Sequence, residues 1–161
     1  MELWKVGDKM YTPEQILDIL RSEHVEFEHI NFNVMGGERP EGIKDENIIK
    51  CLVLKGAYNV YIICIPINKR IDYRKFKRTF GEKKARLVED VEKETGYPHG
   101  ANGPIPISLT SEHIIYFDDT LSDDFLVSNI GEYGNTVKMD AQTLATFVGA
   151  RFSDFTVESG E

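Results

Sequence analysis

The chain has 161 residues, of which 41% are hydrophobic and 29% charged, a composition typical of one globular domain with a sizeable core. Its formal net charge of −8 argues against a protein that coats nucleic acid without selectivity. The longest apolar run, Val60–Ile67, is too short to span a bilayer, and the N-terminus lacks the apolar segment of a signal peptide. We therefore expect a single domain over residues 1–161, located in the cytoplasm and without a membrane partner.

The N-terminal elements follow from capping residues and apolar patterns. Thr12, Pro13 and Gln15 form a capping box with proline at the first helical position, which predicts that a helix begins there. A short strand is expected over Val25–Ile30, and the glycine-containing stretch Asn33–Gly42 predicts an exposed loop.

Two apolar runs indicate a buried hairpin. Ile48–Leu54 and Val60–Ile67 have the composition of core strands, and Gly56–Ala57 marks the turn between them. The two cysteines, Cys51 and Cys64, lie inside these runs, so we interpret them as reduced core thiols. No zinc-ligand spacing is present, and no metal or other cofactor is expected.

Positive charge is concentrated in one stretch, Lys69–Arg86. It holds nine of the nineteen Lys and Arg residues and only two acidic residues, so it carries +7 while the rest of the chain carries −15. Asp72 and Gly81 predict the start and end of a helix there. We expect the apolar side chains of that helix to be buried and its cations to contact the phosphate backbone of a nucleic acid, although a solvated helix face is the alternative. The apolar stripe is Tyr73, Phe76 and Phe80, and the cations are Arg74, Lys75, Lys77 and Arg78.

The remaining pattern mixes strands and helices without regular alternation. A helix is expected near Glu89–Thr95, ending at Gly96, and a last helix between Asp140 and Gly149. Strands are expected at Ile105–Ile107, Ile114–Phe117 and Phe125–Ser128. This order predicts an α+β fold in which helices flank a mixed, curved, barrel-like β-sheet.

The stretch Thr95–Pro106, "TGYPHGANGPIP", contains three glycines, three prolines, one histidine and an Asn-Gly pair. Glycine lets a backbone approach a ligand closely, and proline stiffens a loop. The stretch is therefore either a long connector or a main-chain cradle for a ligand.

Five stretches carry a family resemblance by their order and spacing. They are "IIKCLVL" (Ile48–Leu54), "KKARLVEDVEKETGYPHGANGP" (Lys83–Pro104), "IIYFDDTL" (Ile114–Leu121), "VSNIGEYGNTVKM" (Val127–Met139) and "DAQTLATFVGARF" (Asp140–Phe152). Together they resemble the YbaK/ProX family of aminoacyl-tRNA editing domains over roughly residues 10–155. The resemblance implies a YbaK-like fold and a deacylase that hydrolyses, in trans, the ester of a mischarged tRNA of the Cys-tRNA(Pro) or Ala-tRNA(Pro) type.

The resemblance also implies a site. In the family, a lysine and a G-x-x-x-P loop bind the aminoacyl ester at the tRNA 3′ end. The catalytic positions here are Lys50, Gly100 and Pro104, and the neighbouring substrate-binding positions are His99, Ala101, Asn102 and Gly103. Many relatives have Gly-Gly-x-Ser-Pro in place of this loop, which puts the identity of the amino acid in doubt. For Lys50, a side chain that extends from the strand edge to solvent is the alternative.

Further roles and partners are open. Asp118 or Asp119 could orient the substrate amine, or could cap the following turn, and Ser128 has a similar pair of interpretations. Water or a group of the substrate would attack the activated ester, with His99 as a candidate base or a merely exposed loop residue. The implied partners are the aminoacyl-tRNA 3′ end and, as a second candidate, an aminoacyl-tRNA synthetase; no DNA is expected. Two rival functions remain: a non-catalytic tRNA-binding module, and a binding domain for a small acyl or nucleotide ligand.

Overall fold

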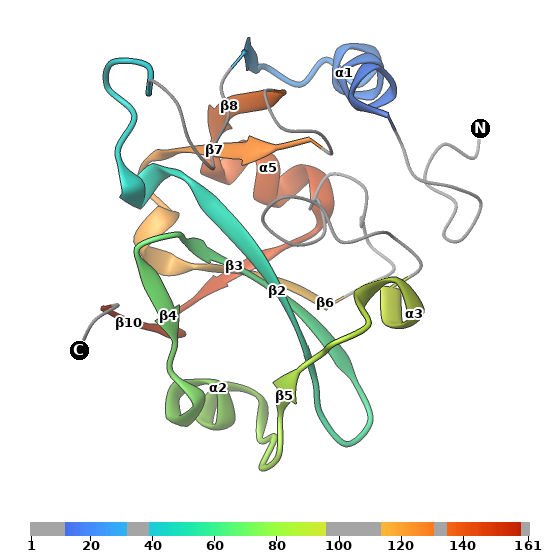
Figure 1. Cartoon of the computed structure of the whole chain (residues 1–161), viewed down its shortest axis with the longest axis vertical. Coiled ribbons are helices and arrows are strands. Elements are labelled where there is room, and N and C mark those ends of the chain that lie inside the picture. The colour runs from blue at the N-terminus through green and yellow to red at the C-terminus, as the bar shows by residue number, and fades with distance from the viewer. Residues whose placement is uncertain (1–11, 32–38, 96–113, 131–134, 159–161) are drawn as a thin grey trace.

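The computed structural model describes residues 12–31, 39–95, 114–130 and 135–158 (Figure 1). The first half contains α1 (Pro13–Ser22), β1 (Glu28–Ile30), η1 (Asp45–Asn47), β2 (Ile49–Lys55), β3 (Val60–Pro66), β4 (Lys69–Ile71) and α2 (Tyr73–Phe80). The second half contains β5 (Arg86–Leu87), α3 (Val91–Thr95), β6 (Ile114–Asp118), η3 (Asp119–Leu121), β7 (Phe125–Asn129), β8 (Thr136–Asp140), α5 (Ala141–Val148), β9 (Arg151–Ser153) and β10 (Thr156–Glu158).

The central sheet is mixed, as the sequence predicted. Its five strands have the order β5-β2-β3-β6-β9, in which β2 pairs antiparallel with β3 and β5, while β6 pairs parallel with β3 and β9. A second sheet has the order β1-β8-β7, and β10 pairs with β4. A single bridge between Ile48 and Val127 connects β7 to the start of β2. The described strands do not form a closed barrel, so the barrel-like closure is not confirmed.

The helix ends predicted at Thr12, Asp72 and Gly81 are confirmed, and each depends on local hydrogen bonds. The Thr12 hydroxyl accepts from the Gln15 backbone N–H at 3.2 Å, and the Gln15 side chain accepts from the Thr12 N–H at 2.8 Å. Asp72 caps α2 by accepting from the Arg74 N–H at 2.9 Å. Gly81 ends α2 in the left-handed conformation, at a φ of 71°, which glycine adopts without steric cost.

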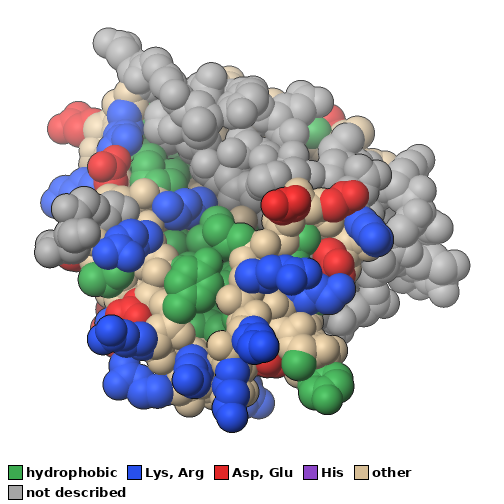
Figure 2. Space-filling view, turned by 60° about the horizontal axis from the view of Figure 1, so that its bottom comes forward, with side chains coloured by type: hydrophobic (Ala, Val, Ile, Leu, Met, Phe, Trp, Pro, Cys, Tyr) green, Lys and Arg blue, Asp and Glu red, His purple; other side chains and the backbone are tan. Residues whose placement is uncertain are grey.

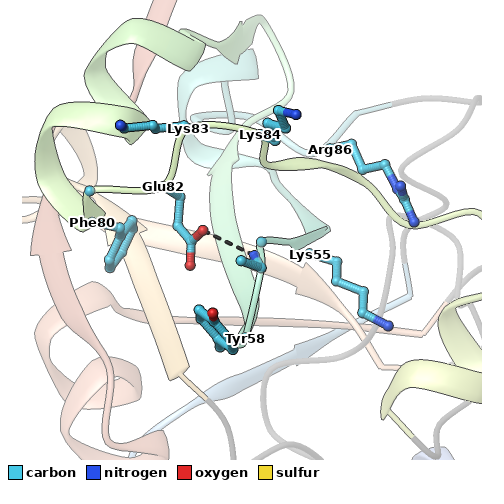
Figure 3. A pocket seen from close by; sticks show the side chains of 10 residues that line it. Lys55, Tyr58, Phe80, Glu82, Lys83, Lys84 and Arg86 are labelled. Atoms are coloured by element: carbon cyan, nitrogen blue, oxygen red, sulfur yellow. Dashed lines mark hydrogen bonds between the residues drawn. The ribbon is translucent and has the colours of Figure 1, made fainter.

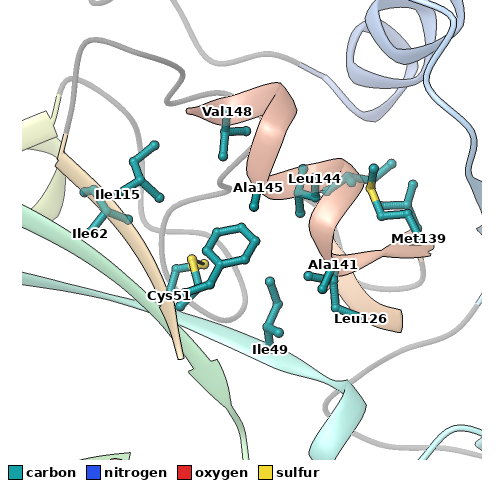
Figure 4. Packing of buried hydrophobic residues seen from close by; sticks show 14 of the residues in the cluster. Ile49, Cys51, Ile62, Ile115, Leu126, Met139, Ala141, Leu144, Ala145 and Val148 are labelled. Atoms are coloured by element: carbon teal, nitrogen blue, oxygen red, sulfur yellow. Dashed lines mark hydrogen bonds between the residues drawn. The ribbon is translucent and has the colours of Figure 1, made fainter. Parts of the chain in front are cut away.

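The central sheet is covered on both faces. On one face, side chains of β2, β3 and β6 pack against α1 and α5 (Figure 4). On the other face, alternate residues of the same strands pack against α2, where the rings of Tyr61, Phe76 and Phe80 are in contact. Cys51 and Cys64 face each other across the β2–β3 pair as buried free thiols, which confirms their interpretation as core residues.

Some sequence expectations need correction or lie outside the described residues. The side chain of Tyr73 is 45% exposed, so the buried stripe of α2 consists of Phe76 and, in part, Phe80. The strand expected at Ile105–Ile107, the helix end at Gly96 and most of the predicted loop after residue 32 lie outside the described residues. Within the part of the chain that is described, no helix combines the length and the hydropathy needed to cross a membrane.

Candidate functional site

Lys50 lies at the start of β2, opposite Ile65 of β3. Its neighbours Ile49 and Cys51 point into the core beneath α5, so strand alternation directs Lys50 to the other face of the sheet. The side chain is half-buried, and this burial lowers the pKa of the Lys50 ammonium. Among the described residues no carboxylate lies within ion-pair distance of it. A weakly hydrated cation is therefore available to a ligand at this position.

Ser128 lies on β7, the strand that the Ile48–Val127 bridge joins to the start of β2. The fold thus brings the Ser128 strand alongside the segment that carries Lys50. The side chain of Ser128 is buried, and its hydroxyl donates to the Asn129 carbonyl oxygen at 3.1 Å. This bond favours a structural role for the hydroxyl, and its contact with substrate stays a prediction.

Asp118 ends β6 and is fully buried. Its carboxylate accepts from the Phe155 backbone N–H at 3.3 Å and from the Thr156 hydroxyl at 2.9 Å, and it also accepts from the Thr120 hydroxyl of the following turn. These bonds fasten the C-terminal segment to β6. In this conformation the carboxylate is enclosed, which favours a structural role over orientation of the amine. That role is to hold residues 155 and 156, because the side chain makes no capping hydrogen bond to the backbone of η3.

Asp119 differs from its neighbour because it is exposed. Its pKa is raised mainly by partial burial of the carboxyl, and further by the charges of Asp118 and Asp154. Oxygen atoms of these three carboxylates lie within 4.8 Å of one another, a spacing that a cation could bridge. Because Asp154 is already paired with Lys75, at 2.9 Å, and Asp118 is already hydrogen-bonded, we assign no metal to this group.

The basic face of α2 is smaller than the sequence predicted. Arg74, Lys77 and Arg78 are exposed, and no ion pair holds them within the described residues. Lys75 instead donates to Asp154, at 2.9 Å, and to the Thr156 carbonyl oxygen, at 2.7 Å. The bond to Asp154 raises the pKa of Lys75. Lys75 therefore attaches α2 to the C-terminal strand, and its predicted phosphate contact is not supported.

The glycine-rich loop lies outside the described residues. This applies to all six of its predicted site residues, namely His99, Gly100, Ala101, Asn102, Gly103 and Pro104. Their convergence on Lys50 stays a prediction. The described part of the site consists of the half-buried cation of Lys50, the neighbouring strand β7 and, more distantly, the cationic face of α2.

Comparison with known proteins assigns the chain to a family. Residues 37–147 match the aminoacyl-tRNA editing domain, a stretch that covers more than half of the chain. The chain belongs to this family. The matched stretch of the editing domain includes Lys50, the glycine-rich loop, Asp118 and Ser128.

Individual relatives are distant. A protein of Enterococcus faecalis named "Putative Cys-tRNA(Pro)/Cys-tRNA(Cys) deacylase EbsC" is 24% identical over 121 residues, which are 73% of each chain. A "Proline--tRNA ligase" of Thermosipho melanesiensis is 28% identical over 69 residues, which are 42% of this chain and 12% of the ligase. A solved structure described as a "putative trans-editing enzyme for prolyl tRNA synthetase" superposes with a TM-score of 0.71 at 19% identity, covering 92% of this chain and 99% of the other.

Proposed function

We propose that this editing domain is an aminoacyl-tRNA deacylase that hydrolyses the ester of a mischarged tRNA in trans. The match of residues 37–147 to the aminoacyl-tRNA editing domain carries this proposal. The description of a structurally similar protein as a "putative trans-editing enzyme for prolyl tRNA synthetase" supports action in trans. The half-buried Lys50 adds a residue-level reason, because a cation at the start of a core strand is costly unless it has a ligand.

The chemistry needs little beyond positioning and electrostatics. An aminoacyl ester is already activated, so water or a group of the substrate can attack its carbonyl carbon. The carbonyl oxygen gains negative charge as this happens, and the ammonium of Lys50 would stabilise that charge. Partial burial strengthens the effect, because fewer waters screen the ammonium. Backbone N–H groups of the Gly100–Gly103 stretch would supply further donors in the same role.

The amino acid and the tRNA belong to the finer part of the proposal. The names of the relatives, a deacylase of Cys-tRNA(Pro) and Cys-tRNA(Cys) and a proline ligase, support a substrate of the Cys-tRNA(Pro) type. Ala-tRNA(Pro) is the second candidate, which the family resemblance alone implies. The direct partner is then the 3′ end of the charged tRNA. The ligase match also supports an aminoacyl-tRNA synthetase as a second partner.

A panel of mischarged tRNAs tests the function, with release of the amino acid as the readout. We expect release from one charged tRNA species, and a rate lower by about 10²–10³-fold in Lys50→Ala, the range typical when one oxyanion donor is removed. Lys44→Ala is the matched control, because Lys44 is an exposed lysine just before η1 and its replacement should leave the rate unchanged. Binding of tRNA without any release would contradict the proposal and favour the non-catalytic module.

A stability measurement separates loss of function from loss of fold. The folded-state pKa of Lys50 is lowered, so the folded protein holds the Lys50 proton less tightly than the unfolded chain does. The charged side chain therefore costs stability at all pH values below that folded pKa, and the cost disappears as pH rises through the normal lysine range. At pH 7, Lys50→Met should consequently unfold at the same temperature as the wild type or higher, while it loses deacylation.

A further inference from the structure

A hollow of about 680 Å³ lies between the β2–β3 turn and the segment that leads from α2 to β5 (Figure 3). It lies at the Lys55 end of β2, whereas Lys50 lies at the other end. Lys55 is five positions after Lys50 on the strand, a distance of about 17 Å at the usual rise per residue. A ligand in the hollow is therefore distinct from an ester held by Lys50.

Glu82 fixes the shape of the hollow. Its carboxylate accepts from the Ala57 backbone N–H at 3.1 Å (Figure 3). It also accepts from the Tyr61 hydroxyl at 2.8 Å. A side chain at Gly56 would collide with the Glu82 carboxyl group in this position, so glycine lets the carboxylate lie this close to the turn. The β2–β3 turn is thus fastened to the residues that follow α2, and the one acidic group among the described lining residues is used in that contact.

Tyr58 lies at the tip of the fastened turn, and 94% of its surface is exposed. Because the ring makes almost no contact with the fold, its apolar face is open to a partner. The turn itself does not require an aromatic residue at this position, since its closing bond runs between the backbones of Gly56 and Asn59, at 2.9 Å. The Tyr58 ring thus presents a flat apolar face to a ligand at the edge of the hollow.

Cations line the same hollow as this ring. Lys83, Lys84 and Arg86 line the hollow, are exposed, and make no ion pair with any residue that the structure describes. Lys55 is different, because its ammonium is paired with Glu94 at 3.0 Å. The three available cations continue toward those of α2, so that Lys and Arg side chains gather around an apolar surface on this side of the molecule (Figure 2). On a protein of net charge −8, such a local patch attracts a polyanion to one place.

We propose that the hollow binds an unstacked nucleotide of the tRNA, with the base stacked on Tyr58 and the flanking phosphates held by Lys83, Lys84 and Arg86. Aromatic faces beside cations are the usual means of holding single-stranded or splayed nucleotides. The proposal rests on the proposed function, because it takes the same tRNA as ligand. The distance along β2 makes the hollow a second contact, which strengthens binding of the tRNA without taking part in ester hydrolysis.

The test measures tRNA binding and chemistry separately. The dissociation constant of uncharged tRNA is measured by fluorescence anisotropy, and the single-turnover deacylation rate is measured at saturating protein. Tyr58→Ala should weaken tRNA binding about 5- to 150-fold, the range for loss of one stacked base, while Tyr58→Phe should remain within about twofold of the wild type. Replacing both Lys83 and Lys84 by alanine should reduce the log–log salt slope by about 1.4–1.8.

Controls distinguish this inference from the proposed function. Lys44→Ala should bind tRNA as the wild type does, and the Tyr58 and Lys83/Lys84 variants should keep the saturated deacylation rate within about twofold, since stacking is expected to act on binding alone. If the wild type releases an amino acid and the hollow variants bind tRNA normally, the inference fails and the function stands. If Tyr58→Ala weakens tRNA binding but the wild type releases nothing from any charged tRNA, the function fails and the hollow remains a tRNA contact. Binding of AMP as tight as that of tRNA would overturn the inference in favour of a mononucleotide site.

Discussion

Replacement of Asp118 by alanine should destabilise the editing domain rather than impair its chemistry alone. The carboxylate is fully buried and accepts from the Phe155 N–H and from the hydroxyls of Thr156 and Thr120. Without it, the Phe155 amide loses its acceptor inside the protein, whereas the hydroxyls can rotate toward other acceptors. A buried donor left unsatisfied costs about 1–3 kcal/mol, and each bond to a charged acceptor contributes about 1.5–3 kcal/mol.

Together these effects predict a loss of about 3–5 kcal/mol in the free energy of unfolding. For a domain of this size, each kcal/mol lowers the melting temperature by about 2–4 °C, so Asp118→Ala should melt roughly 6–20 °C below the wild type. The melting temperature of Asp118→Asn should fall between those of the wild type and Asp118→Ala. The Asn amide oxygen can still accept one or two of the hydrogen bonds, but its NH₂ group faces a donor.

Urea denaturation of the variants and of Asp119→Ala measures this effect, with single-turnover deacylation recorded on the same samples. Asp119 is the matched control, because it is the next carboxylate along the chain and is exposed. At temperatures where Asp118→Ala is still folded, its deacylation should be close to that of the wild type. A variant with unchanged stability and a large loss of deacylation would refute the structural assignment and return Asp118 to orienting the substrate.

Three further predictions concern the α2 face, Asp119 and the glycine-rich loop. The three available cations of α2 should contribute about −2 to −3 to the log–log salt slope of tRNA binding. Replacing Arg74 and Arg78 by glutamate should weaken binding of cognate and non-cognate tRNA alike. If the affinity is unchanged, these side chains face solvent and do not contact tRNA. The raised pKa of Asp119 means that the folded protein binds its proton more tightly than the unfolded chain, so the ionised carboxylate costs stability at pH 7. Asp119→Asn should therefore raise the free energy of unfolding at pH 7. This gain in stability should vanish at about pH 3, below the normal aspartate pKa. Urea titrations at both pH values measure the two free energies. Gly100→Val should abolish most deacylation if backbone donors hold the ester. His99→Ala should change the deacylation rate about tenfold or less if the imidazole is not the base. If the imidazole is the base, the loss should be about 10²–10⁴-fold, and a titration near neutral pH should disappear from the pH–rate profile.

Local patterns were sufficient where the interactions themselves are local. The helix caps at Thr12 and Asp72 and the left-handed end at Gly81 connect residues within a few positions, so the sequence predicts them directly. The two buried strands of the β2–β3 hairpin follow in the same way from continuous apolar runs joined by a short turn. The sequence also predicts the family, because the resemblance depends on the order of motifs along the chain and not on their packing.

Local sequence patterns could not predict the short strands or the partners of individual side chains. β4, β5, β9 and β10 have two or three residues each, too few for a pattern, and they become strands only because a partner strand lies beside them. The same holds for the parallel pairing of β6 with β3, which brings together strands that are distant in the chain. Periodicity can specify a face of an element, but it carries no information about what covers that face.

By itself, the sequence of this protein determined the family, the main helices and the hairpin that carries Lys50. The tertiary structure decided which polar groups remain available to a ligand. Lys75 looked equivalent to its cationic neighbours until the fold brought Asp154, 79 residues away, against its ammonium. Asp118 is buried because it accepts hydrogen bonds from residues 37 and 38 positions later in the chain. Glu82 accepts a hydrogen bond from a turn 25 positions earlier, so its carboxylate is not free to bind a ligand. Hydrogen bonds and ion pairs depend on distances of a few ångströms in space, which only the packed chain sets.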